Sequence, residues 1–258
     1  MPEFEKTFDN AVLDYEISRP EYPKELFDTI WAYKTLDSKS KVLEIGSGTG
    51  KATKPFLDKN CIVTALEPGK QLADLCMKKY AQNKNFLQLN MTLQEFQSSE
   101  NMYDFIFAAT AFHWIPEEYG YKRVFELLKN DGVFARFAYH AGRDHKRQEL
   151  TEEINYLYKK YMNANQEYKE YSEIDAVKLA SLAEYYGFSD SQYWLLHTSK
   201  DFTAEEYMAL LRTYPDHMKL EEDNKKKLFD GIYSAIEKAG GVITVNYAVD
   251  LQMARKRV

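Results

Sequence analysis

The chain has 258 residues and a formal net charge of −6, with 45% hydrophobic and 29% charged residues. A chain of this length buries about 70% of its unfolded surface, and this composition is typical of a globular protein. The acidic balance disfavours a nucleic-acid partner, and two cysteines without metal-ligand spacing, Cys61 and Cys76, lead us to expect neither a disulfide framework nor a metal site.

The N-terminal sequence MPEFEKTFDN is acidic and mixed, unlike a signal or transit peptide. No run approaches eighteen consecutive apolar residues, so we expect no membrane-spanning segment. Together these features predict a cytoplasmic protein with no membrane partner, and no pattern in the sequence assigns an oligomeric state.

The first half of the chain alternates between strands and helices. A helix is predicted to begin near Pro23, because two prolines precede apolar residues at helical spacing. Apolar runs predict strands at KVLEI (41–45), CIVTALE (61–67), FLQLN (86–90), YDFIFAAT (103–110) and VFARFAY (133–139). Helices are predicted between them at KATKPFLDKN (51–60), KQLADLCMKKYAQ (70–82) and PEEYGYKRVFELLKNDG (116–132), the last ended by Asn-Asp-Gly. This alternation predicts a parallel sheet with helices on both faces.

The second half has a different texture. Residues 146–186 are predicted to be helical, followed by a strand at SQYWLLHTSKDF (191–202) and a helix at TAEEYMALLRTY (203–214). A long charged helix over about 221–239 ends at two glycines, and VITVNYAVDLQMAR (242–255) reads as a final strand. We expect the two late strands to form an antiparallel pair at the edge of the sheet.

The loop after the first strand, VLEIGSGTGKAT (42–53), is the main binding signal. Ligands of open parallel sheets bind beyond the carboxyl ends of the strands, and glycines let the backbone approach them closely. The third glycine falls one residue early for the dinucleotide fingerprint G-x-G-x-x-G, whereas G-x-G-x-G after an acid is the pattern of S-adenosylmethionine sites. Glu67, at the tip of the second strand, is placed to bind ribose hydroxyls, or else to cap the helix that follows.

Six segments carry a resemblance to a known family. They are YEISRPEYP (15–23), VLEIGSGTG (42–50), LEP (66–68), MTLQEF (91–96), FIFAATAFHWI (105–115) and FTAEEYMALLRTYPDH (202–217). Together they resemble class I S-adenosylmethionine-dependent methyltransferases of the small-molecule branch, which includes methyltransferase type 11 and trans-aconitate methyltransferase-like proteins.

The resemblance extends over nearly the whole chain and implies a fold. That fold is a Rossmann-like seven-stranded sheet, mostly parallel with an antiparallel edge pair, with helices on both faces and a helical cap. It implies one domain over 1–258, in which 1–140 form the cofactor-binding half. Residues 141–258 would supply the cap, the substrate elements and the last two strands.

The resemblance also implies contacts to S-adenosylmethionine around the glycine loop. Gly46, Ser47 and Gly48 would hold the methionine portion and the ribose through backbone groups. Glu44 would fix the loop, and Glu67 would bind the ribose hydroxyls.

Further contacts are implied on the strands beside the loop. Pro68 would pack against the adenine, while Thr92 and Leu93 would face its edge. Ala109 and Thr110 would border the point of methyl transfer.

Four residues are expected to surround the cofactor and the acceptor from outside these loops. By resemblance, Tyr15 and Arg19 would close over the cofactor from an N-terminal helix. His113 follows the fourth strand and is either a general base or a residue that orients its loop. Arg212, at a helix end in the expected cap, could bind a substrate carboxylate or form a surface ion pair.

The sequence thus predicts an S-adenosylmethionine-dependent methyltransferase acting on a small molecule, with a carboxylic acid as one acceptor. A carboxylate acceptor needs no general base, because it is already a nucleophile. The alternatives are a cofactor-binding module without turnover and a nicotinamide oxidoreductase. A nucleic-acid methyltransferase is disfavoured, since the sequence after strand four is Thr-Ala-Phe-His where base-methylating enzymes carry Pro-Pro and an aromatic residue.

Overall fold

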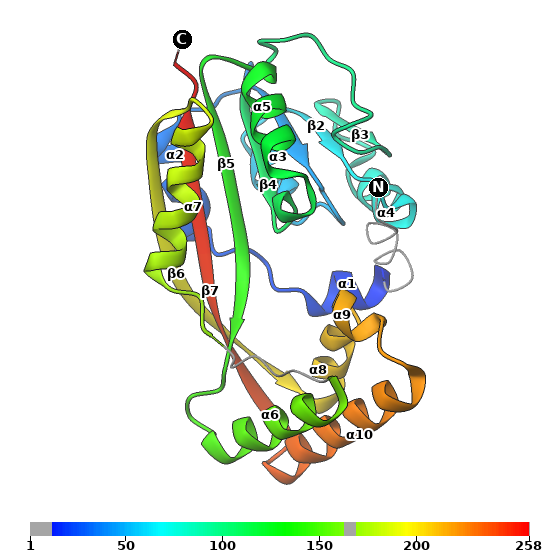
Figure 1. Ribbon diagram of the computed structural model, residues 1–258. Helices are drawn as coiled ribbons and strands as arrows, with labels where there is room; N and C mark the ends of the chain where they lie inside the picture. The colour runs from blue at the N-terminus through cyan, green and yellow to red at the C-terminus, as the bar shows by residue number, and fades with distance from the viewer. Residues whose placement is uncertain (1–11, 163–168, 258) are drawn as a thin grey trace.

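The computed structural model describes residues 12–162 and 169–257, which form a seven-stranded sheet with helices on both faces (Figure 1). The strands in chain order are β1 (Lys41–Ile45), β2 (Ile62–Leu66), β3 (Phe86–Leu89), β4 (Tyr103–Ala109), β5 (Leu128–Gly142), β6 (Ser189–Thr203) and β7 (Val242–Arg255). Their spatial order is β3-β2-β1-β4-β5-β7-β6; the first five pair in parallel, and β7 is antiparallel to both β5 and β6. The predicted Rossmann-like sheet with an antiparallel pair at its edge is confirmed.

The helices divide between the two faces of the sheet and a separate layer. They are α1 (Val12–Ser18), α2 (Lys24–Tyr33), α3 (Thr53–Asp58), α4 (Lys70–Tyr80), α5 (Glu117–Leu127), α6 (Gln148–Met162), α7 (Glu173–Tyr185), α8 (Ala204–Leu211), α9 (Pro215–Met218) and α10 (Glu222–Lys238), with a short 3-10 turn, η2, at Phe112–Trp114. Side chains of a strand alternate between its faces, so Phe105 and Phe107 of β4 pack with α2 and α3, whereas Ile106 packs with α5 and α7.

Strand β5 is longer than the sequence indicated. The helix before it ends at Leu127, and the strand begins at once with the fully buried Leu128. The Asn-Asp-Gly segment therefore lies within the strand, where Asp131 takes a positive φ of 64° and its N–H donates to the carbonyl of Lys256 at 2.8 Å. A Cβ on Gly132 would lie 2.8 Å from the Lys129 carbonyl oxygen, so a glycine is required there.

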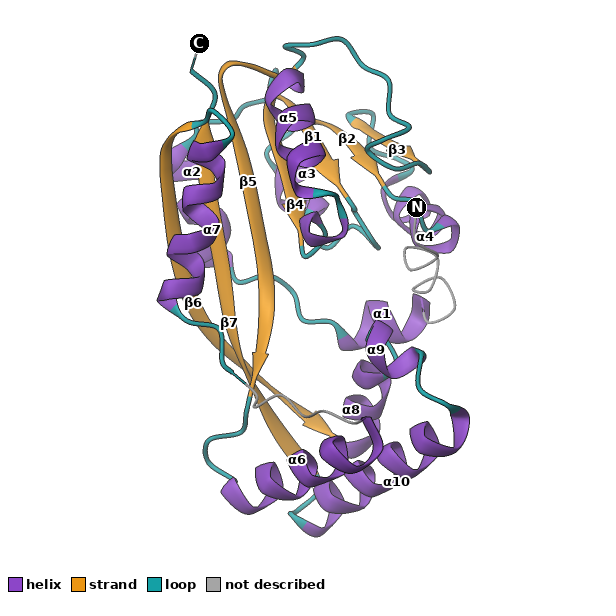
Figure 2. Cartoon of the chain, in the orientation of Figure 1, coloured by secondary structure: helices purple, strands orange, loops and turns teal. Residues whose placement is uncertain are grey.

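Strands β5, β6 and β7 extend past strands β1 to β4 and carry a helical layer made of α6, α8, α9 and α10, which we call the cap (Figure 2). This layer has its own apolar cluster, which includes Leu150, Met208 and Leu228 from the helices and Tyr247 from β7. Helix α1 lies between this layer and the ends of the parallel strands (Figure 2). The cap is thus connected to the sheet by long continuous strands.

Within 12–162 and 169–257, no helix is both long and apolar enough to cross a membrane. The same residues contain no group of three His, Cys, Asp or Glu side chains that could hold a metal ion.

Candidate functional site

Two adjoining pockets open at the carboxyl ends of β1, β2 and β4, where the glycine loop lies. We call them the nucleoside pocket, which contains Glu67, Thr92 and Leu93, and the tyrosine pocket, which contains Arg19. Both pockets are bordered by Tyr15, Gly46, Ala109 and Thr110. The two pockets therefore meet at the end of β4.

The glycine loop is held against the end of β2 by two backbone hydrogen bonds. The N–H groups of Gly46 and Ser47 both donate to the Leu66 carbonyl, at 2.8 and 3.0 Å. Gly46 has a φ of +72°, and a Cβ there would lie 2.5 Å from the Cβ of Ala111, so only glycine fits. At Gly48 a Cβ would instead occupy space 3.4 Å from the Tyr15 hydroxyl. The backbone of Gly48 therefore lies against the Tyr15 ring, and its φ of +55° also favours glycine.

The Glu67 carboxylate joins this loop to the start of α4. One of its oxygens accepts from the Gly48 N–H and the other from the Gly69 N–H, each at 2.8 Å, and the residue is only 6% exposed. Glu67 therefore lines the nucleoside pocket and also accepts from the N–H of Gly69, the residue before α4, while its contact with ribose hydroxyls stays a prediction.

Glu44 lies beneath the loop and lines neither pocket. It is fully buried, and one of its oxygens accepts a 2.5 Å hydrogen bond from the Thr53 hydroxyl. Burial, together with the nearby charge of Glu67, raises the pKa of Glu44 to about 8, although the Thr53 contact opposes this shift. Glu44 therefore holds a proton at neutral pH and supports the loop as a neutral group.

The far wall of the nucleoside pocket is an apolar slot closed by a tight turn. Pro68, Met91 and Leu93 line it, and Leu93 is 2% exposed. The turn is fixed by Glu95, whose carboxylate accepts from the N–H and hydroxyl of Thr92 at 2.9 and 3.0 Å. Glu95 therefore holds the turn in place from within it.

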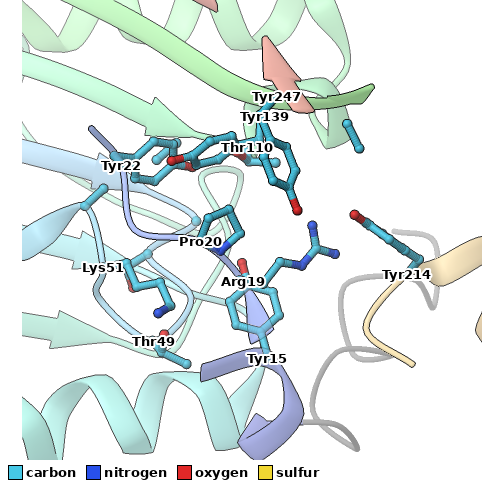
Figure 3. Close-up of a pocket in the computed structure, with 15 residues that line it drawn as sticks. Tyr15, Arg19, Pro20, Tyr22, Thr49, Lys51, Thr110, Tyr139, Tyr214 and Tyr247 are labelled. Carbon is cyan, nitrogen blue, oxygen red and sulfur yellow. The ribbon is translucent and has the colours of Figure 1, made fainter. Parts of the chain in front are cut away.

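The tyrosine pocket is walled by aromatic rings from segments that are far apart in the chain (Figure 3). Its tyrosines are Tyr15, Tyr22, Tyr139, Tyr214 and Tyr247. The Tyr22 and Tyr139 rings stack with centroids 4.9 Å apart, and Tyr247 meets Tyr139 edge-on at 5.2 Å. Such rings form rigid walls that lose little conformational entropy when a ligand is held.

Thr110 stands at the junction of the two pockets with a strained backbone. Its φ is +55°, a region that β-branched residues rarely occupy. Two contacts hold it there: its N–H donates to the Phe137 carbonyl at 2.7 Å, and its hydroxyl is 2.6 Å from the Tyr22 hydroxyl. Backbone strain of this kind clusters at functional sites.

Arg19 follows α1 and points its guanidinium into the tyrosine pocket (Figure 3). Its Nε donates to the Thr213 hydroxyl and its Nη2 to the Thr213 carbonyl, both at 3.0 Å. The guanidinium carbon lies 4.4 Å from the Tyr214 ring centroid and 5.4 Å from that of Tyr15. Arg19 is thereby anchored to the cap while its charge remains in the pocket.

Two residues expected near the reaction point line neither pocket. Arg212 donates from Nε to the Asp14 carboxylate at 2.7 Å and so joins α8 to α1. His113, in η2, is exposed, and its ring lies beside that of Trp114, with centroids 4.7 Å apart.

The nucleoside pocket fits an adenosyl group. Gly46 and Gly48 line it with bare backbone, its floor carries one carboxylate, and its far wall is an apolar slot. The expected residues that line it are Tyr15, Gly46, Gly48, Glu67, Pro68, Thr92, Leu93, Ala109 and Thr110, while Ser47 lines the tyrosine pocket.

The sequence interpretation missed most of the tyrosine pocket. Tyr22, Tyr139 and Tyr247 come from a loop and two strands that meet only in the folded chain. The available signal was compositional: the chain has 20 tyrosines, a number that is compatible with an aromatic-lined cavity.

Residues 42–132 match a family model described as a methyltransferase domain. The chain is 27% identical over 226 residues to an uncharacterized methyltransferase-like protein of Schizosaccharomyces pombe, covering 86% of this chain and 83% of that protein. It is 28% identical over 177 residues to a Saccharomyces cerevisiae protein named "Probable S-adenosylmethionine-dependent methyltransferase", covering 62% of this chain and 58% of that protein.

A solved structure with the same fold is that of Haemonchus contortus phosphoethanolamine N-methyltransferase 2, in complex with phosphomonomethylethanolamine and S-adenosylhomocysteine. The TM-score is 0.59 at 15% sequence identity, covering all of this chain, which spans 61% of the length of that one. At this identity the likeness establishes the shared fold.

Proposed function

Because this chain is a class I S-adenosylmethionine-dependent methyltransferase, we propose that it methylates a small carboxylic acid held in the tyrosine pocket. In this proposal 1–258 act as one domain. Residues 1–140 bind the cofactor, and the cap within 141–258 completes the acceptor pocket through Tyr214 and Tyr247.

The proposed cofactor contacts follow the nucleoside pocket. Glu67 would hold the ribose hydroxyls, and Pro68 and Leu93 would enclose the adenine. The backbone from Gly46 to Gly48 would hold the methionine portion. This assignment is supported by the depth of Glu67, which is 6% exposed, and by the bare backbone of Gly46 and Gly48 in the pocket lining.

The position of Arg19 carries the proposal for an acid acceptor. Its guanidinium is a cation that lines the tyrosine pocket, and an arginine fork matches the two oxygens of a carboxylate. Lys51 lines the same pocket but is paired with Glu21 at 2.6 Å. The remaining walls combine five tyrosines with small residues such as Gly46, Ala109 and Ala141.

The reaction requires alignment and exclusion of water more than proton transfer. When bound, S-adenosylmethionine would supply an electrophilic methyl group. Arg19 would orient the carboxylate so that one of its oxygens faces Ala109 and Thr110. Tyr15 and Tyr214 would close the pocket against solvent. A carboxylate is already deprotonated at neutral pH, so no residue has to act as a general base.

The proposal is tested with methyl-labelled S-adenosylmethionine and three acids, namely succinate, citrate and benzoate, beside benzamide, phenol and benzylamine. We expect label in at least one acid as a methyl ester, which mild base releases as volatile methanol. Label that appears only in the amine, or that resists base, would contradict an acid acceptor. If none of the six compounds leads to release of S-adenosylhomocysteine, the proposal is contradicted as well.

A variant pair sharpens this test. Arg19→Gln should lower kcat/KM for the acid roughly ten- to hundredfold, the value of a hydrogen bond to a charged group. Arg123→Gln is the matched control, since Arg123 also donates to a main-chain carbonyl, that of Phe96, but lines neither pocket. The control should leave kcat/KM within twofold of the wild-type value.

A further inference from the structure

The hydroxyl of Tyr247 is a buried polar group without a hydrogen-bond partner among the described residues. Tyr247 lies on β7, where it pairs with Ala141 of β5 on one side and Thr198 of β6 on the other. The residue is 3% exposed, yet it lines the tyrosine pocket. An unpaired hydroxyl at such depth lowers stability, so its place beside a cavity indicates that its partner arrives with a ligand.

The other tyrosine hydroxyls on this wall are already engaged. Tyr139 donates to the Glu21 carbonyl, and Tyr22 shares a hydrogen bond with Thr110. Their rings shape the pocket, and their hydroxyls are satisfied within the protein. The Tyr247 ring also packs in this wall, against Tyr139, but its hydroxyl has no hydrogen-bond partner among the described residues.

The groups around the Tyr247 hydroxyl define what it can bind. Figure 3 shows Tyr247 on the same side of the pocket as Tyr139, with Arg19 and Tyr214 facing it. Burial raises the pKa of Tyr247 and of Tyr214 above the ordinary value, so both are neutral hydroxyls and can donate. A guanidinium and two neutral hydroxyls form a set of donors, and such a set favours an anionic oxygen.

We propose that Tyr247 is the residue that recognises the acceptor's acid group, donating a hydrogen bond to one carboxylate oxygen while Arg19 holds the carboxylate from the opposite side. This inference rests on the proposed function, which names the carboxylic acid. It adds a specificity residue that lies 228 positions after Arg19 and outside every motif of the sequence.

The test is Tyr247→Phe, which removes the hydroxyl and keeps the ring. Tyr33→Phe is the matched control, because the Tyr33 hydroxyl donates to the Asp190 carbonyl at 2.5 Å and Tyr33 lines neither pocket. Binding of succinate, citrate and benzoate is measured by calorimetry on the complex with S-adenosylhomocysteine. Unfolding midpoints in urea are measured without ligand.

We expect Tyr247→Phe to raise the dissociation constant of the bound acid roughly ten- to hundredfold. Affinity for S-adenosylhomocysteine should stay within twofold. The urea midpoint of Tyr247→Phe should equal or exceed that of the wild type, because the variant loses an unsatisfied group, whereas Tyr33→Phe should lower it. A purely structural tyrosine would not combine weaker acid binding with unchanged or higher stability.

Three results would overturn the inference: equal acid affinity in Tyr247→Phe and wild type, loss of stability in Tyr247→Phe as large as in Tyr33→Phe, or no binding of any of the three acids to the wild type. The first two leave the proposed function standing if an acid is methylated in the labelling assay. Methylation of the amine alone, together with the third result, removes the proposed function as well.

Discussion

Glu44 is a carboxyl group that the fold keeps neutral. It lies at 0% exposure under the glycine loop, with one oxygen bonded to Thr53 and the other without a partner among the described residues. A buried carboxylate in this position would lie close to the charge of Glu67. Protonation removes that repulsion, so the protonated form of Glu44 is favoured in the folded chain.

This arrangement predicts a pH dependence of stability. Because burial raises the pKa of Glu44 to about 8, while an unfolded glutamate titrates near about 4.3, the folded state binds the extra proton between these values. The free energy of unfolding should therefore fall as pH rises from about 4.5 to about 8. In Glu44→Gln this fall should be smaller, so the variant gains stability relative to the wild type as pH rises.

The measurement is urea unfolding at pH 5 and pH 8. Glu206→Gln serves as the control, since hydrogen bonds from Thr203 lower the pKa of Glu206 and keep it ionised across this range. Its unfolding free energy should be offset from the wild-type value by a constant amount. Parallel pH curves for Glu44→Gln and wild type would rule out a neutral Glu44.

At the scale of elements, α1 connects the cap to the sheet. On the cap side Asp14 pairs with Arg212 at 2.7 Å, and on the sheet side Glu16 pairs with Lys79 of α4 at 2.6 Å. Between these contacts Tyr15 borders both pockets. The two ion pairs therefore hold α1, and with it Tyr15, at the border of both pockets.

Exchange of the Asp14–Arg212 pair separates a positioning role for Arg212 from a catalytic one. Arg212→Asp alone should weaken S-adenosylhomocysteine binding by up to about fivefold, the upper value of a surface pair, and leave kcat within twofold. The double variant Asp14→Arg with Arg212→Asp should restore most of the binding. A large fall in kcat that the exchange does not rescue would instead place Arg212 at the acceptor.

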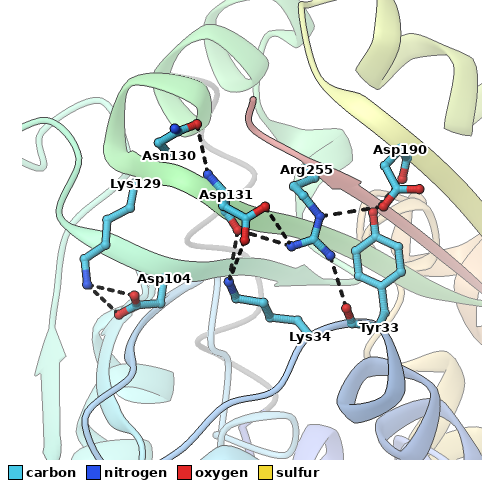
Figure 4. Close-up of polar contacts among 8 residues, drawn as sticks. All are labelled: Tyr33, Lys34, Asp104, Lys129, Asn130, Asp131, Asp190 and Arg255. Atoms are coloured by element: carbon cyan, nitrogen blue, oxygen red, sulfur yellow. Dashed lines mark hydrogen bonds and ion pairs between the residues drawn. The ribbon is translucent and has the colours of Figure 1, made fainter. Parts of the chain in front are cut away.

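At the scale of the whole molecule, the two ends of the sheet have different roles. The pockets occupy the carboxyl ends of the parallel strands, and the opposite end is tied together by ion pairs (Figure 4). There Asp104 accepts from Lys129 at 2.7 Å and from the Lys41 N–H at 2.8 Å, and Arg255 bonds to Asp131 at 3.3 Å. Glu67 and Asp104 are thus two hydrogen-bonded carboxylates at opposite ends of the parallel strands.

Because Glu67 lies at the pocket and Asp104 lies away from it, the two acids allow a thermal test of the cofactor site. A ligand at a hundred times its dissociation constant adds about 2.7 kcal/mol, and each kcal/mol raises Tm by about 2–4 °C in a chain of this size. S-adenosylmethionine should therefore raise Tm by about 5–10 °C in the wild type and in Asp104→Asn. Both acid variants should be less stable without ligand. Only Glu67→Gln should lose the shift, and a full shift in that variant would exclude Glu67 from ribose binding.

The sequence predicted what depends on local pattern. The strand before Gly46, the acid at the tip of β2 and the helices between the first five strands all follow from apolar runs and turn residues close together in the chain. The antiparallel edge pair was predicted as well. The spatial order of the two strands in this pair was not predicted. Strand β7 lies between β5 and β6 through pairings of distant segments, such as that of Val133 with Arg255.

The same limit applies to the candidate site. Most of the nucleoside pocket follows the carboxyl ends of β1, β2, β3 and β4. The glycine loop and Glu67 were predicted from their positions after β1 and β2, whereas Pro68, Thr92 and Thr110 were expected from the family resemblance. The tyrosine pocket joins Tyr22, Thr110, Tyr139 and Tyr247 through contacts that no spacing indicates. The anchoring of Arg19 by Thr213 is likewise a contact across 194 positions. Such features are set by tertiary packing.

Tyr15 forms part of the wall of both compartments. A displacement of the Tyr15 ring would therefore change the walls of the nucleoside pocket and the tyrosine pocket together. The ion pair between Glu16 and Lys79 of α4 holds α1 beside both pockets.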